Sequence, residues 1–178
     1  MSRSAATALA VLLVVSVVAY LLACSQAAWS PDGEHIAFVS HVGEEGEHRL
    51  YVAPASGKSS RMLWRSSWFL GPPGWSPDGK HLAVVQVAPL PDVAVEDAAD
   101  WPRSEEGTEK TRVPLVARLY RVDARSGERG LVTEQKFLGD SDLATDVREG
   151  PEPQAQWAGD GKLLVWPIVS LRQVRMLD

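Results

Sequence analysis

The sequence predicts an all-β fold that is assembled from repeated sheet units. The five residues Trp-Ser-Pro-Asp-Gly occur twice, at positions 29–33 and 75–79, and a degenerate copy, Trp-Ala-Gly-Asp-Gly, lies at 157–161. Each copy precedes a stretch of apolar residues of the kind that forms strands. Because a motif that recurs every few tens of residues is typical of repeat architectures, it indicates the fold class before any single residue is considered.

The motif is expected to form a tight turn that leads into a strand. Residues 30–33, Ser-Pro-Asp-Gly, are the types preferred in a type I turn, with proline second and glycine fourth. In the strand that follows, alternation places Ile36 and Phe38 on the same face. The structural repeat positions are Trp29, Pro31, Asp32 and Gly33, then Trp75, Pro77, Asp78 and Gly79, and finally Trp157, Asp160 and Gly161.

The spacing of the motif divides residues 29–178 into two complete units and half of a third. The first unit, residues 29–74, contains 46 residues, a usual length for a four-stranded β-propeller blade. The second unit covers residues 75–156, and the half unit covers residues 157–178. Both complete units contain a Leu-Tyr strand, beginning at Leu50 and at Leu119, that leads into a Ser-Gly turn. We therefore expect an incomplete β-propeller of about two and a half blades.

Two and a half blades cannot close a propeller ring, and the apolar sheet faces at the two ends need neighbours to cover them. Since residues 157–178 stop inside a unit, the chain is expected to be part of a longer propeller. The alternative is self-association, in which a second copy covers the open blade edges.

The extra length of the second unit lies in two acidic insertions, residues 88–113 and 137–153. Both contain proline and lack strong periodicity, so they are expected to be exposed loops. Inserted loops on a rigid scaffold often carry recognition, which makes the insertion around Trp101 the best candidate for a feature particular to this protein. A solvated loop without a partner is the alternative that its composition favours.

The order of these elements is similar to the β-propeller repeats of TolB-like proteins. The resemblance is carried by the paired Trp-Ser-Pro-Asp-Gly motifs, the Ile-Ala-Phe strand at 36–38 and the Leu-Tyr strands. It implies a non-enzymatic periplasmic scaffold whose partners are envelope proteins or peptides, such as the peptidoglycan-associated lipoprotein. The same repeats occur in the propellers of dipeptidyl-peptidase-like serine peptidases, so the alternative is the N-terminal propeller of a membrane-anchored peptidase. A propeller that binds a sugar or another small ligand is a third hypothesis.

Residues 1–24 have the composition of an export signal or a membrane anchor. Arg3 is the only charge, and from Ala5 to Cys24 the chain is almost entirely apolar, which predicts an N-terminal apolar helix. The sequence Leu-Leu-Ala-Cys at 21–24 resembles the bacterial lipobox, with Cys24 as the candidate lipid attachment site. An uncleaved anchor and cleavage after Ala27 are the alternatives. All three place the body of the protein outside the cytoplasm, attached to the envelope membrane in the first two.

The sequence contains no constellation that predicts catalysis, a cofactor or a metal. Asp32 and Asp78 occupy equivalent turn positions, and His35 and His81 repeat in the same way, so all four are expected to be structural. There is no Gly-x-Ser-x-Gly elbow and no phosphate-binding loop. The net charge of −5 and the lack of a basic cluster argue against a nucleic-acid partner.

The tryptophans fall into two groups. Those that open the repeat are expected to pack between blades. Trp64, Trp68 and Trp101 lie outside this frame and are candidates for a contact surface, because tryptophan is enriched in interfaces. For Trp64 and Trp68, burial against a neighbouring blade is the favoured alternative, since most propeller strands are covered.

Overall fold

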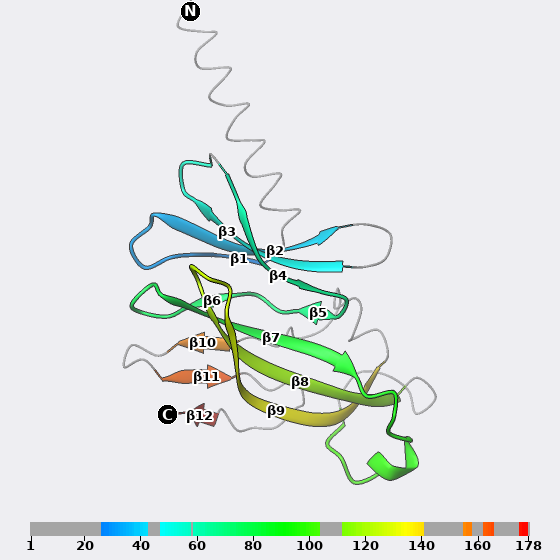
Figure 1. Ribbon diagram of the computed structural model, residues 1–178. Coiled ribbons are helices and arrows are strands. Elements are labelled where there is room, and N and C mark those ends of the chain that lie inside the picture. The colour runs from blue at the N-terminus through cyan, green and yellow to red at the C-terminus, as the bar shows by residue number, and fades with distance from the viewer. Residues whose placement is uncertain are drawn as a thin grey trace, which may run out of the picture.

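The computed structural model describes residues 26–42, 47–57, 59–103, 112–140, 155–157, 162–165 and 175–177. These residues form an all-β structure of three antiparallel sheets that follow one another in chain order (Figure 1). The one short helix among them is the 3-10 turn η1 (Glu96–Ala98). The expected N-terminal apolar helix lies outside the described residues, and nothing in the described part supports it. Within that part, no helix has the length and apolar character needed to span a membrane.

The first sheet, called blade 1, is a four-stranded meander in the order β1-β2-β3-β4. Its strands are β1 (Gln26–Trp29), β2 (His35–Val42), β3 (Glu47–Pro54) and β4 (Arg61–Ser66). All neighbours are antiparallel, with one irregularity between Leu50 and Tyr51 where β3 pairs with β4. This is the simple up-and-down arrangement of a propeller blade.

The second sheet, called blade 2, has five strands. These are β5 (Phe69–Leu70), β6 (Gly74–Trp75), β7 (His81–Pro89), β8 (Arg112–Asp123) and β9 (Arg129–Asp140). Both β5 and β6 pair with β7, so together they act as one interrupted innermost strand. The interruption falls at residues 71–73, Gly-Pro-Pro, because proline has no N–H to donate to a ladder. Blade 2 therefore begins at Phe69, ahead of the second motif.

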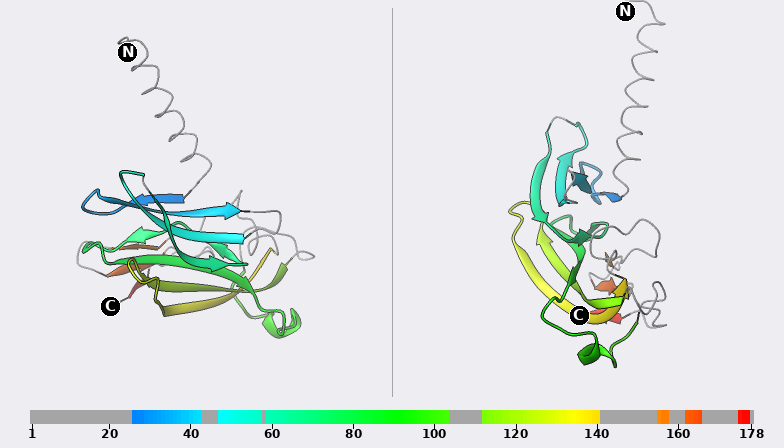
Figure 2. Two further views of the ribbon diagram at one scale, coloured as in Figure 1. Left: turned by 45° about the horizontal axis from the view of Figure 1, so that its top comes forward. Right: turned by 90° about the vertical axis from the view of Figure 1, so that its right-hand side faces the viewer.

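The third sheet, called blade 3, contains β10 (Ala155–Trp157), β11 (Leu163–Val165) and β12 (Arg175–Leu177) in sequential order. Trp157 pairs with Leu163, whereas Trp29 pairs with Ile36 and Trp75 with Leu82. The hairpin of the third copy is therefore one residue shorter than the other two, in line with its loss of Ser-Pro. Figure 2 shows the succession of the three sheets from two further directions.

Two hydrophobic clusters fill the spaces between successive sheets. Between blades 1 and 2, Val39, Leu50 and Trp64 pack against Leu82 and Val84. Between blades 2 and 3, the cluster consists of Ala83, Val85, Leu119 and Ala155, with Ala117 and Trp157 packed against it. Successive residues of β7 point alternately into the two clusters, so blade 2 is covered on both faces. This explains why the sequence of β7 is almost continuously apolar.

Polar contacts also join blades 1 and 2. The Leu70 N–H donates to Nδ1 of the fully buried His48 at 3.3 Å. Arg61 Nη2 donates to the Ala124 carbonyl oxygen at 2.7 Å. Gln86 Nε2 donates to Ser66 Oγ at 2.9 Å. All three bonds bridge the two blades, and the bond to His48 satisfies a side chain that packing has removed from water.

The turn predicted for the motif is present in both complete units. The Gly33 N–H donates to the Ser30 carbonyl oxygen at 2.9 Å, and Gly79 makes the same bond to Ser76. Both glycines have positive φ, +72° and +69°. Side chains other than glycine rarely adopt this conformation, which explains the invariant last position of the motif.

The insertions differ from the sequence prediction at their ends. Strands β7, β8 and β9 continue into both of them, with Ala88 opposite Val116 and Leu115 opposite Phe137. Val87, Leu115 and Phe137 form a separate buried cluster with Phe69 of β5. These ends are therefore paired and buried rather than exposed loops. The acidic residues inside the first insertion obscured its apolar end at Val113, which continues the strand alternation of Leu115 and Ala117 just outside it.

Candidate functional site: two exposed protein-contact surfaces

A hydrogen bond from each motif tryptophan links successive blades. Trp75 Nε1 donates to the Ala28 carbonyl oxygen at 3.0 Å, and Trp157 Nε1 donates to the Gly74 carbonyl oxygen at 3.1 Å. Ala28 and Gly74 each directly precede a motif tryptophan of the blade before. The motif therefore has a second role besides forming the turn: it supplies the donor and the acceptor of a hydrogen bond that joins each blade to the next.

Trp29 differs from the other two motif tryptophans. Its side chain is 59% exposed, whereas Trp75 and Trp157 are packed against inter-blade clusters. Sequence reasoning expected all three to lie between blades, and for Trp29 this is wrong. Among the described residues, the sheets that cover Trp75 and Trp157 have no counterpart on the Trp29 side of blade 1.

The first exposed surface, called the open face, is the side of blade 1 that points away from blade 2. Trp29 pairs with Ile36 across β1 and β2, and Phe38 pairs with Tyr51 across β2 and β3. The Phe38 and Tyr51 rings are stacked, with centroids 5.3 Å apart. Met62, the partner of Tyr51 on β4, is 50% exposed. The open face thus has aromatic side chains on three adjacent strands, of which Trp29 is exposed and Phe38 is buried.

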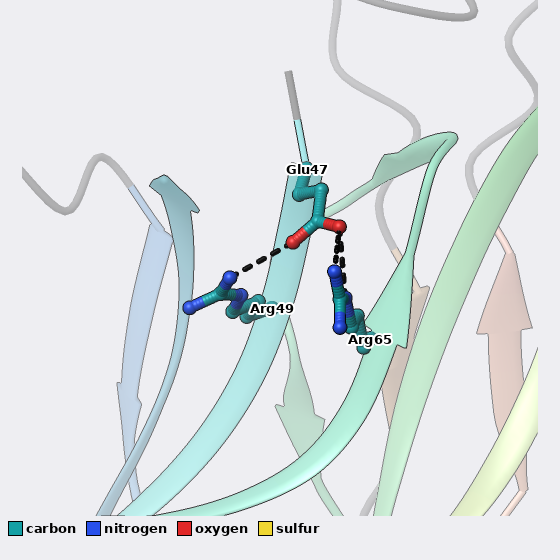
Figure 3. Close-up of polar contacts among 3 residues, drawn as sticks. All are labelled: Glu47, Arg49 and Arg65. Atoms are coloured by element: carbon teal, nitrogen blue, oxygen red, sulfur yellow. Dashed lines mark hydrogen bonds and ion pairs between the residues drawn. The ribbon is translucent and has the colours of Figure 1, made fainter. Parts of the chain in front are cut away.

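Charged residues lie at one end of the open face (Figure 3). Arg49 Nη2 donates to Glu47 Oε2 at 2.9 Å, and Arg65 Nε donates to Glu47 Oε1 at 2.8 Å. Arg65, and after it Arg49, hold the pKa of Glu47 below its usual range. Two guanidinium groups therefore share one carboxylate. Arg49 Nε is buried and has no hydrogen-bond partner in the described part of the chain.

The second exposed surface is the edge of β9, the last strand of blade 2. Leu131 and Val132 on this strand are 53% and 39% exposed. At its other end, the Leu138 N–H donates to the Pro102 carbonyl oxygen at 2.8 Å, and Arg103 forms a parallel bridge with Leu138. The protein's own inserted segment thus begins to add a strand to this edge. An edge strand with unpaired backbone groups is a template for further pairing.

Trp101 is placed next to this edge. The segment from Leu90 to Arg103, which contains η1, extends from the end of β7 at the lower right of Figure 1. Trp101 is half-buried, and Lys136 Nζ of β9 lies 5.8 Å from the centroid of its ring. The first insertion therefore packs partly against β9 instead of standing free. Sequence reasoning singled out Trp101 but not the edge beside it, since edge and insertion are far apart in the chain.

Trp64 and Trp68 have different surroundings. Trp64 is buried in the cluster between blades 1 and 2, in edge-to-face contact with Tyr120, and the Arg129 guanidinium lies 4.8 Å above its ring. It therefore cannot contribute to a contact surface in this fold, and the alternative of burial between blades holds for it. Trp68, in the connection between β4 and β5, is 39% exposed. Cys24, Asp160 and Gly161 lie outside the described residues.

The motif aspartates serve the turns. The Ser30 hydroxyl donates to Asp32 Oδ1 at 2.6 Å, and the Glu34 N–H donates to the same oxygen at 2.9 Å. These bonds hold the pKa of Asp32 below its usual value, and Ser76 and the Lys80 N–H do the same for Asp78. The hydrogen bonds of the turn thus favour the ionised form of each carboxylate.

Among the described residues, one group of side chains lies within the reach of a single metal ion, namely Asp32, Glu34 and His35. Asp32 and Glu34 are exposed, and Oδ1 of Asp32 already accepts the turn's hydrogen bonds. In blade 2, Lys80 replaces Glu34 at the equivalent position. The group is therefore not a property of the repeat, and its contacts are those of a turn.

No protein-family model and no curated protein matches the chain. Among solved structures, a putative TolB from Agrobacterium tumefaciens is 20% identical with a TM-score of 0.46, over 79% of this chain and 36% of that one. TolB from Acinetobacter baumannii is 18% identical with a TM-score of 0.32, over 85% and 39%. The β-propeller domain of the Trilobed protease from Pyrococcus furiosus is 14% identical with a TM-score of 0.40, over 86% and 42%.

These neighbours are TolB and other β-propeller proteins, and the chain spans less than half the length of each of the three. The blade assignment itself rests on the chain's own stacked antiparallel sheets and on the tryptophan bonds that join them.

Proposed function

We propose that this protein is a non-enzymatic β-propeller scaffold of the cell envelope that binds proteins or peptides along the edge of β9. The observation that supports this most directly is the bond from the Leu138 N–H to the Pro102 carbonyl oxygen. The chain's own segment there occupies the position that an added strand would take. A partner peptide would continue this pairing along β9, a recurring mode of peptide recognition.

The register of blade 2 indicates which backbone groups remain for a partner. Leu138 lies opposite Pro114, which has no N–H, and the Leu138 N–H points away from β8. Because outward and inward groups alternate along an antiparallel strand, the N–H groups of Lys136 and Glu134 also point outward. An extended peptide would bond to them, and its apolar side chains would contact the exposed Leu131 and Val132.

Proline at position 136 tests this binding mode. Lys136→Pro removes an N–H that β8 does not use, and proline is tolerated on an edge strand when its missing N–H faces solvent. Lys136→Thr is the matched control, because it removes the charge and keeps the N–H.

A photo-crosslinking amino acid at Val132 captures the binding partner in cells. The same amino acid at the exposed Glu34 serves as the reference position.

We expect a discrete crosslinked protein from Val132 that is lost with Lys136→Pro and retained with Lys136→Thr. Crosslinks that persist with Lys136→Pro, or that are the same from Glu34, would show that partners do not pair with this edge.

The envelope location is supported by the composition of residues 1–24, with Cys24 as the proposed lipid attachment site. The intact mass of the protein purified from membranes should include the mass of a lipid, and Cys24→Ser should remove it. An intact Met1, or a mature chain that begins at Ala28, would contradict lipidation while leaving the binding proposal unaffected.

A further inference from the structure

Two exposed cations lie on β9, one near each end of the strand. The Arg129 Cζ lies 4.8 Å from the ring centroid of the buried Trp64. The Lys136 Nζ lies 5.8 Å from the ring centroid of Trp101. Within the described part of the chain, neither cation forms an ion pair with a carboxylate. An aromatic ring attracts a cation but does not neutralise its charge, so both remain able to bind an anionic group.

The register of blade 2 places both cations on the same face. Arg129 lies opposite Val122, and Lys136 lies opposite Val116, which is six residues away on β8. Because side chains alternate along a strand, residues six positions apart point to the same side. Val122 packs in the cluster between blades 1 and 2, so this is the side that faces blade 1. Six residues of strand place the two cations about 20 Å apart.

The part of this face between the two cations carries no uncompensated charge. The Arg118 Nε donates to Glu134 Oε2 at 3.3 Å, so the carboxylate is paired within the sheet. Leu131, opposite Tyr120, is 53% exposed. A strand added to the edge would therefore pass a cation, an ion pair, an exposed leucine and a second cation.

We propose that the β9 edge binds an extended peptide segment that carries two acidic side chains and an apolar one between them. The acidic side chains pair with Lys136 and Arg129, and the apolar one contacts Leu131. Charge complementarity supports this partner, since a carboxylate near each end meets a cation that has no other anionic partner in the described residues. This partner chemistry rests on the proposed strand pairing at the same edge.

The register of β8 also gives the spacing of these side chains. A strand antiparallel to β9 that follows the same register has its acidic residues six positions apart, as Val116 and Val122 are. Its apolar residue lies two positions before the acidic residue that meets Arg129, as Tyr120 lies two positions before Val122.

The peptide Thr-Glu-Thr-Thr-Thr-Leu-Thr-Glu-Thr has this pattern and serves as the probe. In the matched neutral peptide, both glutamates are glutamine, which keeps the size of the side chains and removes their charge. Fluorescence anisotropy of the labelled peptides, with the full-length protein in a non-ionic detergent and about 50 mM salt, measures the two dissociation constants.

We expect the acidic peptide to bind about tenfold more tightly than the neutral one, because each exposed ion pair contributes about two- to fivefold. The difference should shrink as salt is added. Lys136→Thr removes one pair, so it should weaken binding by about two- to fivefold and still permit it. This agrees with the retained crosslink expected for that variant.

A charge exchange tests the contact with Arg129 directly. Arg129→Glu should weaken the acidic peptide about tenfold, because an attraction becomes a repulsion. A peptide with lysine in place of its second glutamate should bind Arg129→Glu better than it binds the unaltered protein. Arg121→Glu is the matched control, because Arg121 is exposed and lies opposite Gly130, on the other face of the sheet. It should change the affinity for the acidic peptide by less than about twofold.

Lys136→Pro separates the partner chemistry from the strand pairing. We expect it to abolish binding of the acidic peptide, which supports both. Equal affinities for the acidic and neutral peptides, or no recovery in the charge exchange, would overturn the acidic partner and leave the pairing in place if Lys136→Pro still abolishes binding. Binding that Lys136→Pro leaves unchanged would overturn the pairing and the acidic partner together. If neither peptide binds, the acidic partner is overturned, and the crosslinks from Val132 decide on the edge itself.

Discussion

Replacing Gly127 by alanine tests how rigidly blades 1 and 2 are packed together. Gly127 lies in the turn between β8 and β9 and has a φ of +78°. A Cβ atom there would lie 2.9 Å from the Leu63 carbonyl oxygen and 3.4 Å from Leu63 Cα. Both atoms belong to the backbone of blade 1, so they cannot turn aside as the end of a flexible side chain can.

The turn has little freedom to move away from Leu63. The Gly127 N–H donates to the Asp123 carbonyl oxygen at 2.9 Å. The Asp123 carboxylate accepts the N–H groups of Arg125 at 2.9 Å and of Ser126 at 2.6 Å. Relief of the clash therefore requires the two blades to separate locally.

Two effects add up in Gly127→Ala. A left-handed conformation costs alanine about 1 kcal/mol relative to glycine. Forcing a methyl group against fixed backbone costs a further ~1–3 kcal/mol. Gly57→Ala is the matched control, since Gly57 has a φ of +69° but no atom within 4 Å of its Cβ position. The two variants share the backbone strain and the change in the unfolded chain. We expect Gly127→Ala to lower the free energy of unfolding by ~1–3 kcal/mol more than Gly57→Ala.

Urea unfolding followed by tryptophan fluorescence measures both variants. The urea concentration at the midpoint of unfolding should fall, while the slope of the unfolding free energy against urea concentration stays the same. This indicates a change in stability rather than in the surface exposed on unfolding. If the two variants differ by less than about 0.5 kcal/mol, the contact between Gly127 and Leu63 is not rigid and the reasoning is refuted.

Three further predictions concern the inter-blade bond, the cluster at the end of blade 2 and the motif turn. Trp75→Phe leaves the Ala28 carbonyl without its donor and should destabilise the fold by ~1–3 kcal/mol in urea unfolding, whereas the exposed Trp68→Phe should change it by less than about 0.5 kcal/mol. Phe137→Ala should cost ~3–5 kcal/mol in the same assay, because Phe137 is fully buried; a negligible loss would restore the exposed-loop prediction. The hydrogen bonds from the Ser76 hydroxyl and the Lys80 N–H lower the pKa of Asp78, so as the pH falls the unfolded chain takes up the proton first. The contribution of Asp78 is thus complete above about pH 4 and is lost as the pH falls through the lower folded-state pKa, and Asp78→Asn should reduce the loss of stability between about pH 5 and about pH 2. An unchanged acid dependence would show that this carboxylate does not stabilise the turn.

The sequence predicted the local structure of the repeat well, because that structure depends on neighbouring residues alone. The glycine at the end of the turn has positive φ in both complete units, and its N–H bonds to the serine three positions earlier. Serine, proline and glycine at these positions favour the turn wherever the motif occurs in the chain.

The ends of the insertions were not predicted, because their partners are distant in the sequence. Leu115 faces Phe137 across β8 and β9, and Phe69 completes the cluster from β5. The acidic, proline-containing composition of these segments predicted exposed loops over their whole length, whereas their ends are strand residues. The edge of β9 became visible as a candidate surface only when this pairing was known.

By itself, the sequence determined that the chain is built from repeated turn-and-strand units, since turn chemistry and strand alternation act over a few residues. It could not determine which copy of a repeated residue is buried. Trp29 and Trp75 occupy the same position of the same motif, yet Trp29 is 59% exposed while Trp75 packs against the cluster between blades 1 and 2. Tertiary structure decided this difference, because the burial of a side chain depends on whether another sheet lies against it.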